Sequence, residues 1–281
     1  MSEGTGPAIK IPGISEFLVQ VYGEQREALL DYAVARGHGV EVADFISPEL
    51  LDEADGRAKL VAWYRARLPE VRGTLGFHGA LHDLLPSAFD PKVRAVARDR
   101  IARCLDIAAE LSAGSIVFHS DFNPVKRSPE YHENWAARQR DFWQEMMRGR
   151  RIALLIENVW DPTPETIARW MAEIGLESAG VCFDAAHAHL WGSTPPAEWV
   201  KALAQSIRYL HISDNDRTWD QHLTAGQGTV DWAAFLGALE AEGLTLPAVI
   251  EVDGVEGAEG TEQYLRRISE PRAKTTSGGG E

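Results

Sequence analysis

The sequence predicts a single (β/α)8 TIM barrel, an α/β fold in one domain. Apolar runs of strand length alternate eight times with segments of helical periodicity. The chain has 281 residues, and a barrel of this kind needs about 250. In the second half, four apolar runs each end in an acid or a histidine, namely IALLIEN, AGVCFDAAH, IRYLHISDN and PAVIEVDG. Such side chains at the carboxyl ends of strands are what a site at the mouth of a parallel barrel requires.

In the first half of the chain, each expected strand is a continuous apolar run, and the following helix has apolar residues spaced at 3.6. Strands are expected at 17–21, 39–45, 74–79 and 115–120. Helices are expected at 24–36, 48–68, 91–111 and 130–148. The segment QVYGEQRE after the first strand lacks the Gly-rich phosphate loop of a doubly wound sheet, which favours the barrel.

The second half continues the alternation. Strands are expected at 152–158, 180–187, 207–213 and 247–252, and helices at 196–205, 232–242 and 261–268. A further helix begins near Pro164, where the missing N–H of proline needs no partner. Strands separated by helices imply parallel pairing with right-handed crossovers. We therefore expect one barrel over residues 1–271 and a flexible tail over 272–281, which ends in TTSGGGE.

Composition narrows the class of partner. Acidic residues outnumber basic ones by 42 to 28, giving a formal net charge of −14. Lysine and arginine would have to supply the attraction to a phosphate backbone or an anionic membrane, so neither nucleic acid nor a membrane is expected as a partner. Two cysteines, no signal-like N-terminus and no long apolar run indicate a soluble cytoplasmic protein without a disulfide framework. The oligomeric state stays open, a homo-oligomer included.

Six ionisable residues stand at the carboxyl ends of expected strands three to eight: His78, His119, Glu157, Asp184, His211 and Glu251. Any one of them alone is more often a structural or solvated residue. Burying all of them together without a cation would be costly, so the pattern indicates a metalloenzyme. Oxygen-rich ligation by three carboxylates and the imidazole of His211 suits Mn²⁺, Mg²⁺, Co²⁺ or Zn²⁺ and argues against a thiolate-preferring metal.

Further candidates surround this set. His187 lies three residues after Asp184, so one of the two can bind an ion while the other reaches the substrate or a second ion. Asp220 and His222 alternate in WDQHL, where they are either additional ligands or solvated loop residues. Three tryptophans follow strands five, six and seven and either wall the site or simply pack: Trp160, Trp191 and Trp219.

The segments IEN, CFDAAHAHLWG, YLHISDNDR, DQHLTAGQGTVDW and VIEVDG resemble those of the xylose isomerase-like TIM barrel superfamily. That superfamily contains sugar phosphate isomerases and epimerases and the abasic-site (AP) endonucleases of family 2, and the resemblance covers nearly the whole chain. It implies that one divalent ion is held by four residues: Glu157, Asp184, His211 and Glu251. It also implies that Glu157 and Glu251 exchange protons with a sugar and that His187 and Arg217 contact substrate oxygens.

Resemblance and ligand pattern together predict a divalent-metal-dependent sugar or polyol isomerase or epimerase, acting by proton transfer through a metal-bound enediolate. Removing a proton next to a carbonyl requires stabilisation of an enediolate oxygen, which a metal supplies as a Lewis acid. The carboxylates of Glu157 and Glu251 would remove and return the proton. The expected partner is a small sugar or sugar-like molecule, phosphorylated or not.

The alternative is a multinuclear zinc phosphodiesterase related to the AP endonucleases. In that family three zinc ions are held by nine residues, and each has a counterpart here: His78, His119, Glu157, Asp184, His187, His211, Asp220, His222 and Glu251. The lack of a histidine at the end of the first strand and the strong negative charge count against it. A nonenzymatic, metal-stabilised binding barrel is a third alternative.

Overall fold

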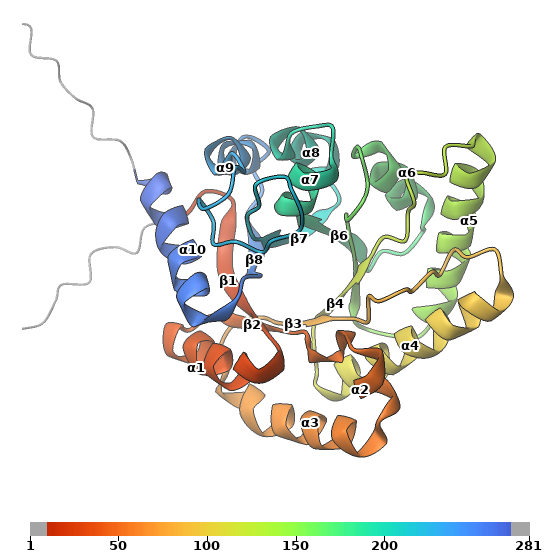
Figure 1. The fold of residues 1–281 in the computed structure, drawn as a ribbon, viewed down its shortest axis with the longest axis horizontal. Coiled ribbons are helices and arrows are strands. Elements are labelled where there is room, and N and C mark those ends of the chain that lie inside the picture. The colour runs from red at the N-terminus through yellow and green to blue at the C-terminus, as the bar shows by residue number, and fades with distance from the viewer. Residues whose placement is uncertain (1–9, 271–281) are drawn as a thin grey trace, which may run out of the picture.

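The computed structural model describes residues 10–270. Eight parallel strands form a closed barrel in chain order, and β1 pairs with both β2 and β8. The helices surround these strands (Figure 1). The predicted (β/α)8 barrel is therefore confirmed, whereas the tail expected at 272–281 lies outside the described residues.

The strands lie close to their expected positions: β1 Ile14–Val21, β2 Gly39–Val42, β3 Leu75–His78, β4 Ser115–His119, β5 Ala153–Glu157, β6 Ala179–Asp184, β7 Ile207–Ile212 and β8 Leu246–Ile250. The first strand begins earlier than expected because Ile14 already pairs with Leu246 of β8. The second ends earlier, at Val42, because Asp44–Ile46 turns into a short 3-10 helix, η2.

The ten α-helices among residues 10–270 are α1 Arg26–Arg36, α2 Pro48–Asp52, α3 Ala54–Arg67, α4 Pro91–Glu110, α5 Pro129–Met146, α6 Glu165–Glu173, α7 Ala185–Trp191, α8 Pro196–Leu203, α9 Trp232–Ala241 and α10 Gly254–Ser269. Short 3-10 helices are η1 Gly23–Gln25 and η3 Leu68–Glu70.

Three helix expectations were wrong. The single helix expected over 48–68 is two helices, because Glu53 between them has an extended backbone (φ −81°, ψ 99°). Residues 185–187, expected in the sixth strand, begin α7, because the Asp184 side chain accepts a hydrogen bond from the backbone N–H of His187 (2.6 Å) and caps the helix. The last helix begins at Gly254 instead of residue 261.

Two apolar clusters form the core. The larger lies between the strands and the surrounding helices, and a smaller one fills the barrel lumen with Leu18, Val117, Leu155, Cys182, Tyr209 and Val249. Glycines make room for it on β2 and β3: a Cβ atom at Gly76 would stand 2.4 Å from the Tyr209 hydroxyl, and one at Gly39 would stand 2.7 Å from Leu18 Cγ. Because the lumen is packed, a site must lie above it, at the mouth of the barrel.

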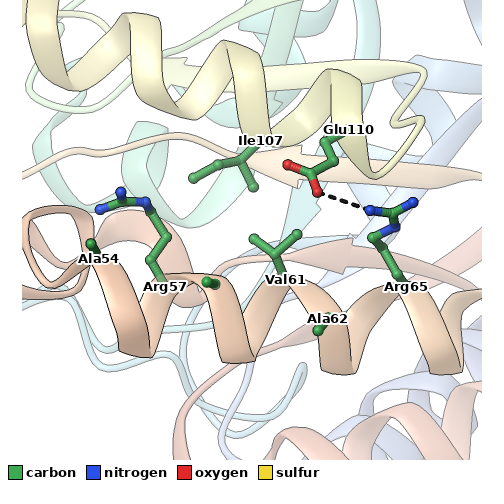
Figure 2. Close-up of a pocket in the computed structure, with 8 residues that line it drawn as sticks. Ala54, Arg57, Val61, Ala62, Arg65, Ile107 and Glu110 are labelled. Carbon is green, nitrogen blue, oxygen red and sulfur yellow. Dashed lines mark hydrogen bonds and ion pairs between the residues drawn. The ribbon is translucent and has the colours of Figure 1, made fainter.

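Three other features of the described chain concern its cysteines, its helices and its outer surface. Cys104 and Cys182 are buried and unpaired. No helix within residues 10–270 combines the length and the apolar character needed to cross a membrane. A hollow of about 450 Å³ lies between α3 and α4 on the outside of the barrel, beside the ion pair of Arg65 and Glu110 (3.2 Å) (Figure 2). None of the expected site residues lines it.

Candidate metal centre

Each strand of the barrel, or the residue directly after it, places one polar side chain above the lumen. Side chains alternate along a strand, so the residue two positions after a lumen residue faces the same side. On β5, for example, Leu155 fills the lumen and Glu157 follows it. The eight residues in this position are Gln20, Glu41, His78, His119, Glu157, Asp184, His211 and Glu251. Six of them were expected from the sequence, and they come together at the mouth as one group.

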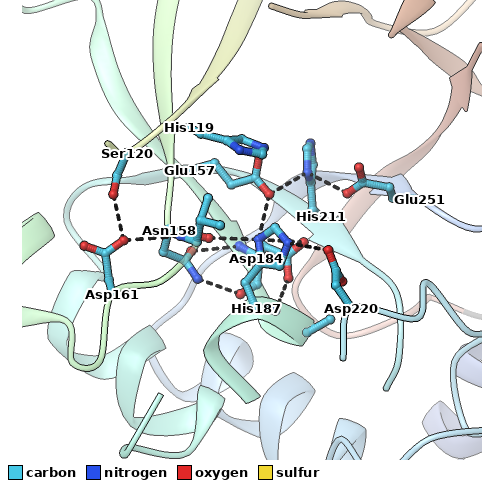
Figure 3. Close-up of polar contacts among 12 residues, drawn as sticks. His119, Ser120, Glu157, Asn158, Asp161, Asp184, His187, His211, Asp220 and Glu251 are labelled. Atoms are coloured by element: carbon cyan, nitrogen blue, oxygen red, sulfur yellow. Dashed lines mark hydrogen bonds and ion pairs between the residues drawn. The ribbon is translucent and has the colours of Figure 1, made fainter. Parts of the chain in front are cut away.

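Glu157 lies at the centre of this group and is fully buried. Its Oε2 is 3.3 Å from Nε2 of both His78 and His119. Its Oε1 is 3.1 Å from Nδ1 of His187 and 3.3 Å from Nδ1 of His211 (Figure 3). Four imidazoles from β3, β4, α7 and β7 therefore converge on one carboxylate.

Glu157, Asp184, His211 and Glu251 fit a divalent ion. One ligand atom from each lies within 4.8 Å of the others. Each also has a buried atom without a hydrogen-bond partner among the described residues: Glu157 Oε1, Asp184 Oδ2, His211 Nδ1 and Glu251 Oε2. Unpartnered buried polar atoms are costly, and an ion with ligands at about 2.0–2.2 Å would satisfy all four after small side-chain movements. Three oxygens and one nitrogen suit the Mg²⁺, Mn²⁺, Co²⁺ and Zn²⁺ class.

The protonation states of this group are also compatible with a bound cation. Burial opposes ionisation of Glu157 and Glu251, but the His211 imidazole holds the pKa of Glu157 well below its usual range and lowers that of Glu251 to about 2. Burial raises the pKa of Asp184 to about 7. Burial disfavours protonation of His211, yet Cys182 and the carboxylates raise its pKa well above the usual range. Protons on His211 and Asp184 thus offset the negative charge of the carboxylates. A divalent ion bound at this place would displace those protons.

Two further groups of donors adjoin the centre. His78, His119 and Glu157 also have ligand atoms within 4.8 Å of one another. On the other side, Asp220 Oδ2 lies 3.2 Å from Nε2 of both His187 and His222. All nine residues of the multinuclear alternative are therefore brought together in one contiguous set.

The loop after β7 is built to present these groups. His222 has a left-handed backbone (φ 47°), which is uncommon for a residue other than glycine, and its Nδ1 contacts the backbone carbonyl of Glu251 (3.0 Å). Asp214 anchors the loop by accepting hydrogen bonds from the backbone of Gly226 (2.8 Å) and from the indole of Trp232 (3.0 Å). The side chains of Asp220 and His222 are thus held in place by the loop itself.

A cavity of about 380 Å³ opens above the centre. It is lined by residues at the ends of strands and in the loops that follow them: Gln20, Tyr22, Ile46, Leu81, His119, His187, Trp219, Asp220, Gln221, His222, Glu251 and Asp253. The candidate ligands form one polar side, and Ile46 and Leu81 supply an apolar wall that sequence patterns did not indicate. Its size is within the range of small-molecule sites.

The remaining expected substrate contacts lie at different depths. Trp219 lines the cavity, and the ring of Trp191 lies 5.3 Å from the ring of His187. Trp160 is exposed on the loop after β5 and does not line the cavity. Arg217 is exposed, has a left-handed backbone (φ 70°) and points its guanidinium at the carbonyl of Gly192 (3.5 Å), so it too stands outside the cavity lining.

Gln20 and Glu41 are members of the site that the sequence reasoning missed. The Gln20 amide donates to Glu251 Oε1 (2.8 Å) and to Glu41 Oε1 (3.2 Å). Glu41, which is fully buried, lies 3.3 Å from His211 Nε2. When a histidine binds a metal through one ring nitrogen, a carboxylate hydrogen-bonded to the other nitrogen fixes the tautomer and the orientation of the ring. Each residue is the single polar side chain of an apolar strand, FLVQV or GVEV, and that signal would have found them.

The barrel and the polar residues at its mouth agree with the protein family that the sequence matches. Residues 33–270 match the family described as xylose isomerase-like TIM barrel. The chain belongs to this family, as the resemblance of its segments predicted.

The structure is similar to the TTHB071 protein from Thermus thermophilus, solved after soaking with ZnCl2, with 30% identity, a TM-score of 0.75 and coverage of 92% of this chain and 100% of that one. It is also similar to a D-tagatose 3-epimerase-like protein at 21% identity, TM-score 0.74, covering 90% and 96% of the two chains, a likeness of fold. An uncharacterized Methanocaldococcus jannaschii protein, MJ1311, is 27% identical over 214 residues, 70% of this chain and 72% of its own.

Proposed function

We propose that this chain is a divalent-metal-dependent isomerase or epimerase of a sugar or polyol, acting by proton transfer between carbon atoms. The observation that carries the proposal is the pair of carboxylates on either side of His211. Glu157 Oε1 and Glu251 Oε2 lie 3.3 and 2.9 Å from His211 Nδ1, and both carboxylates are held in the ionised form. Glu251 lines the cavity and Glu157 lies beneath it, so both are close to a molecule bound there.

The roles of the residues follow from their surroundings. An ionised carboxylate accepts a proton from the carbon next to a carbonyl, and a second carboxylate returns it to the neighbouring position or the other face. A divalent ion held by Glu157, Asp184, His211 and Glu251 would stabilise the negative charge of the enediolate as a Lewis acid. Gln20 holds Glu251 Oε1 (2.8 Å), which leaves Oε2 directed at the centre. His187 lines the cavity and would hold a substrate hydroxyl.

The cavity favours an uncharged substrate. Among the described residues, its lining includes no lysine or arginine, while Asp220, Glu251 and Asp253 are acidic. The three imidazoles of the lining, those of His119, His187 and His222, are paired with carboxylates. A phosphate group is usually held by arginine, lysine or a helix N-terminus. Similar folds named as D-allulose 3-epimerase in complex with D-allulose and as D-psicose 3-epimerase with D-tagatose support a sugar as the substrate class.

Proton exchange with solvent tests the proposal. The Mn²⁺-loaded protein is incubated in D2O with D-tagatose, D-allulose and D-fructose, and deuterium incorporation is followed by NMR. We expect exchange at a carbon next to the carbonyl, reduced about 10²- to 10⁴-fold in Glu157→Gln and in Glu251→Gln. Glu110→Gln, on the outer helix α4, is the control and should exchange normally. Undiminished exchange in either site variant would remove the proton-transfer role.

A multinuclear phosphodiesterase is the second candidate, and the contiguity of nine donor residues favours it. Metal analysis separates the two, because one ion per chain supports the isomerase and two or three zinc ions support the hydrolase. Duplex DNA with an abasic site is the matching substrate. The net charge of −14 predicts no cleavage, since the DNA backbone would be repelled. Efficient zinc-dependent cleavage, abolished by His119→Ala, would replace the isomerase with the endonuclease.

A further inference from the structure

Three of the nine tryptophans are strongly exposed, and all three lie at the mouth of the barrel. Trp160 follows β5, Trp191 ends α7 after β6, and Trp219 lies in the loop after β7; they are 48%, 37% and 63% exposed. Five others, on helices α5, α6, α8 and α9, are buried. An exposed indole leaves a large apolar face in water, so this distribution needs a reason beyond packing.

Hydrogen bonds join the three loops that carry these tryptophans. The backbone N–H of Ser193, two residues after Trp191, donates to the carbonyl of Pro162 (2.9 Å), two residues after Trp160. The guanidinium of Arg217, two residues before Trp219, donates to the carbonyl of Gly192 (3.5 Å). The segments that carry the three exposed indoles therefore adjoin one another along the rim, and we call these residues the tryptophan arc (Trp160, Trp191 and Trp219).

The tryptophan arc is continuous with the candidate site. Trp219 lines the cavity, and Trp191 contacts His187, which also lines it (ring centroids 5.3 Å apart). Trp160 lies outside the cavity lining, so the arc extends from the cavity onto the rim. A molecule bound with one end at the carboxylates of Glu157 and Glu251 would meet the arc with its other end.

The chemistry of this path identifies the ligand class. Flat indole faces bind the apolar C–H faces of sugar rings and aromatic groups, whose hydroxyl edges remain in water. The cavity lining, all of it within the described chain, offers no lysine or arginine, and its three imidazoles, those of His119, His187 and His222, are already paired with carboxylates. The guanidinium of Arg217 beside the arc is directed at the carbonyl of Gly192 (3.5 Å), so an uncharged group fits this path better than a phosphate. We propose that the tryptophan arc is a binding subsite for a second sugar ring or an aryl group, so that the substrate is an uncharged glycoside or oligosaccharide. This inference rests on the proposed function in one respect, namely that the reacting sugar is bound in the cavity.

Equilibrium binding tests the subsite without requiring turnover. The Mn²⁺-loaded protein is titrated by calorimetry with D-glucose and D-fructose, with the extended ligands cellobiose, turanose and 4-nitrophenyl β-D-glucoside, and with D-glucose 6-phosphate. We expect the extended ligands to bind about tenfold more tightly than the monosaccharides, and the phosphate ester more weakly than either. In Trp160→Ala and in Trp219→Ala, the ratio of extended to monosaccharide affinity should fall toward one. Phe89→Ala removes an 85% exposed aromatic on the loop after β3 and should leave the ratio unchanged.

Several results would overturn the subsite. They are equal affinity for short and extended ligands, an unchanged ratio in both tryptophan variants, tighter binding of the phosphate ester, and no binding of any carbohydrate in the panel. A lower molar mass of Trp160→Ala in light scattering would identify the arc as a contact between copies of the chain instead. If the ratio falls as expected but no ligand exchanges protons with solvent, the subsite stands and the proposed function fails. If protons exchange but the ratio is unchanged, the proposed function stands and the subsite fails.

Discussion

Two clusters of buried carboxylates and imidazoles lie in this barrel, one at its mouth and one at the amino end of β2, and they differ in how their oxygens are satisfied. In the second cluster, Glu262 of α10 accepts hydrogen bonds from Arg36 (2.8 Å) and Tyr32 (3.2 Å) at Oε2 and from Arg266 (2.7 Å) at Oε1. His38 lies 3.1 Å from the same Oε2. At the mouth, by contrast, four candidate ligand atoms make no hydrogen bond among the described residues and approach one another and His187, at 2.9–3.7 Å. The two clusters contain similar residue types. They differ in the number of hydrogen-bond donors that the chain supplies to each carboxylate.

The two clusters also differ in the charged groups that surround their carboxylates. Around Glu262 the cationic side chains outnumber the single carboxylate, and they hold its pKa well below the usual range although burial opposes this. At the mouth, five carboxylates and five imidazoles alternate, and no arginine or lysine forms an ion pair with them among the described residues; the carboxylates are Glu41, Glu157, Asp184, Asp220 and Glu251. The amino-end cluster is neutralised by its own arginines, whereas the donor atoms at the mouth are compatible with a metal ion.

Exchanging one carboxylate in each cluster should have opposite effects. Glu157→Gln should lower turnover about 10²- to 10⁴-fold with little loss of stability, because its carboxylate serves the site. Glu262→Gln should leave turnover unchanged and reduce the free energy of unfolding by about 1–3 kcal/mol, because it loses charge-assisted hydrogen bonds. Kinetics and urea unfolding of both variants measure this. Equal stability losses in the two would contradict the distinction between the clusters.

Metal content should depend on the mouth alone. His211→Ala and Asp184→Ala each remove one of the four proposed ligands, so both should lose bound ion during gel filtration. The wild-type protein should show a melting temperature that rises with added Mn²⁺, because an ion that binds only the folded state stabilises it by mass action. Glu262→Gln should keep full occupancy. Full occupancy in the two ligand variants, measured by plasma mass spectrometry, would mean that the ligand set is wrong.

Glu41 should act on the metal through His211. Its carboxylate lies 3.3 Å from Nε2, which favours the tautomer that leaves Nδ1 free for the ion. Glu41→Gln should therefore lower the affinity for Mn²⁺ about 10- to 100-fold. Competition with a fluorescent chelator measures the affinity, and Glu262→Gln is the matched control, a buried carboxylate at the other cluster. Unchanged affinity would reduce Glu41 to a packing role.

His78 and His119 should have a smaller effect, because both contact Glu157 at Oε2, away from the oxygen that faces His211. If one ion suffices, replacing either by alanine should reduce turnover about tenfold, as expected for a lost hydrogen bond to a charged group. The primary ion should stay bound. Loss of more than one ion per chain in either variant would instead indicate a multinuclear centre.

Much of this organisation can be predicted from the sequence, and the exceptions have physical reasons. Continuous apolar runs located all eight strands, and acids or histidines at their ends located six of the eight residues at the mouth. Gln20 and Glu41 were missed because each lies inside its apolar run, whereas candidate site residues were sought only at the ends of the runs. Helix α7 escaped because a side-chain cap at Asp184, and not an apolar period, begins it. Ile46 and Leu81 line the cavity because the segments after β2 and β3 fold over the mouth. A local sequence pattern does not indicate where such segments lie.

The smallest expected effect concerns acid stability at the amino-end cluster. Glutamate in an unfolded chain has a pKa of about 4.3, and the cations around Glu262 hold its folded pKa well below that. Its contribution to stability is thus fully present above about pH 5 and is lost as the pH falls toward the folded pKa. In Glu262→Gln this contribution is missing at every pH, so the stability difference from wild type should be largest at pH 7 and should shrink between pH 5 and pH 3. Urea unfolding across this range measures the difference. Glu110→Gln, which removes an exposed ion pair with Arg65, is the control and should show almost no difference at any pH. A difference that stays constant down to pH 3 would show that shape, and not charge, is what Glu262 contributes.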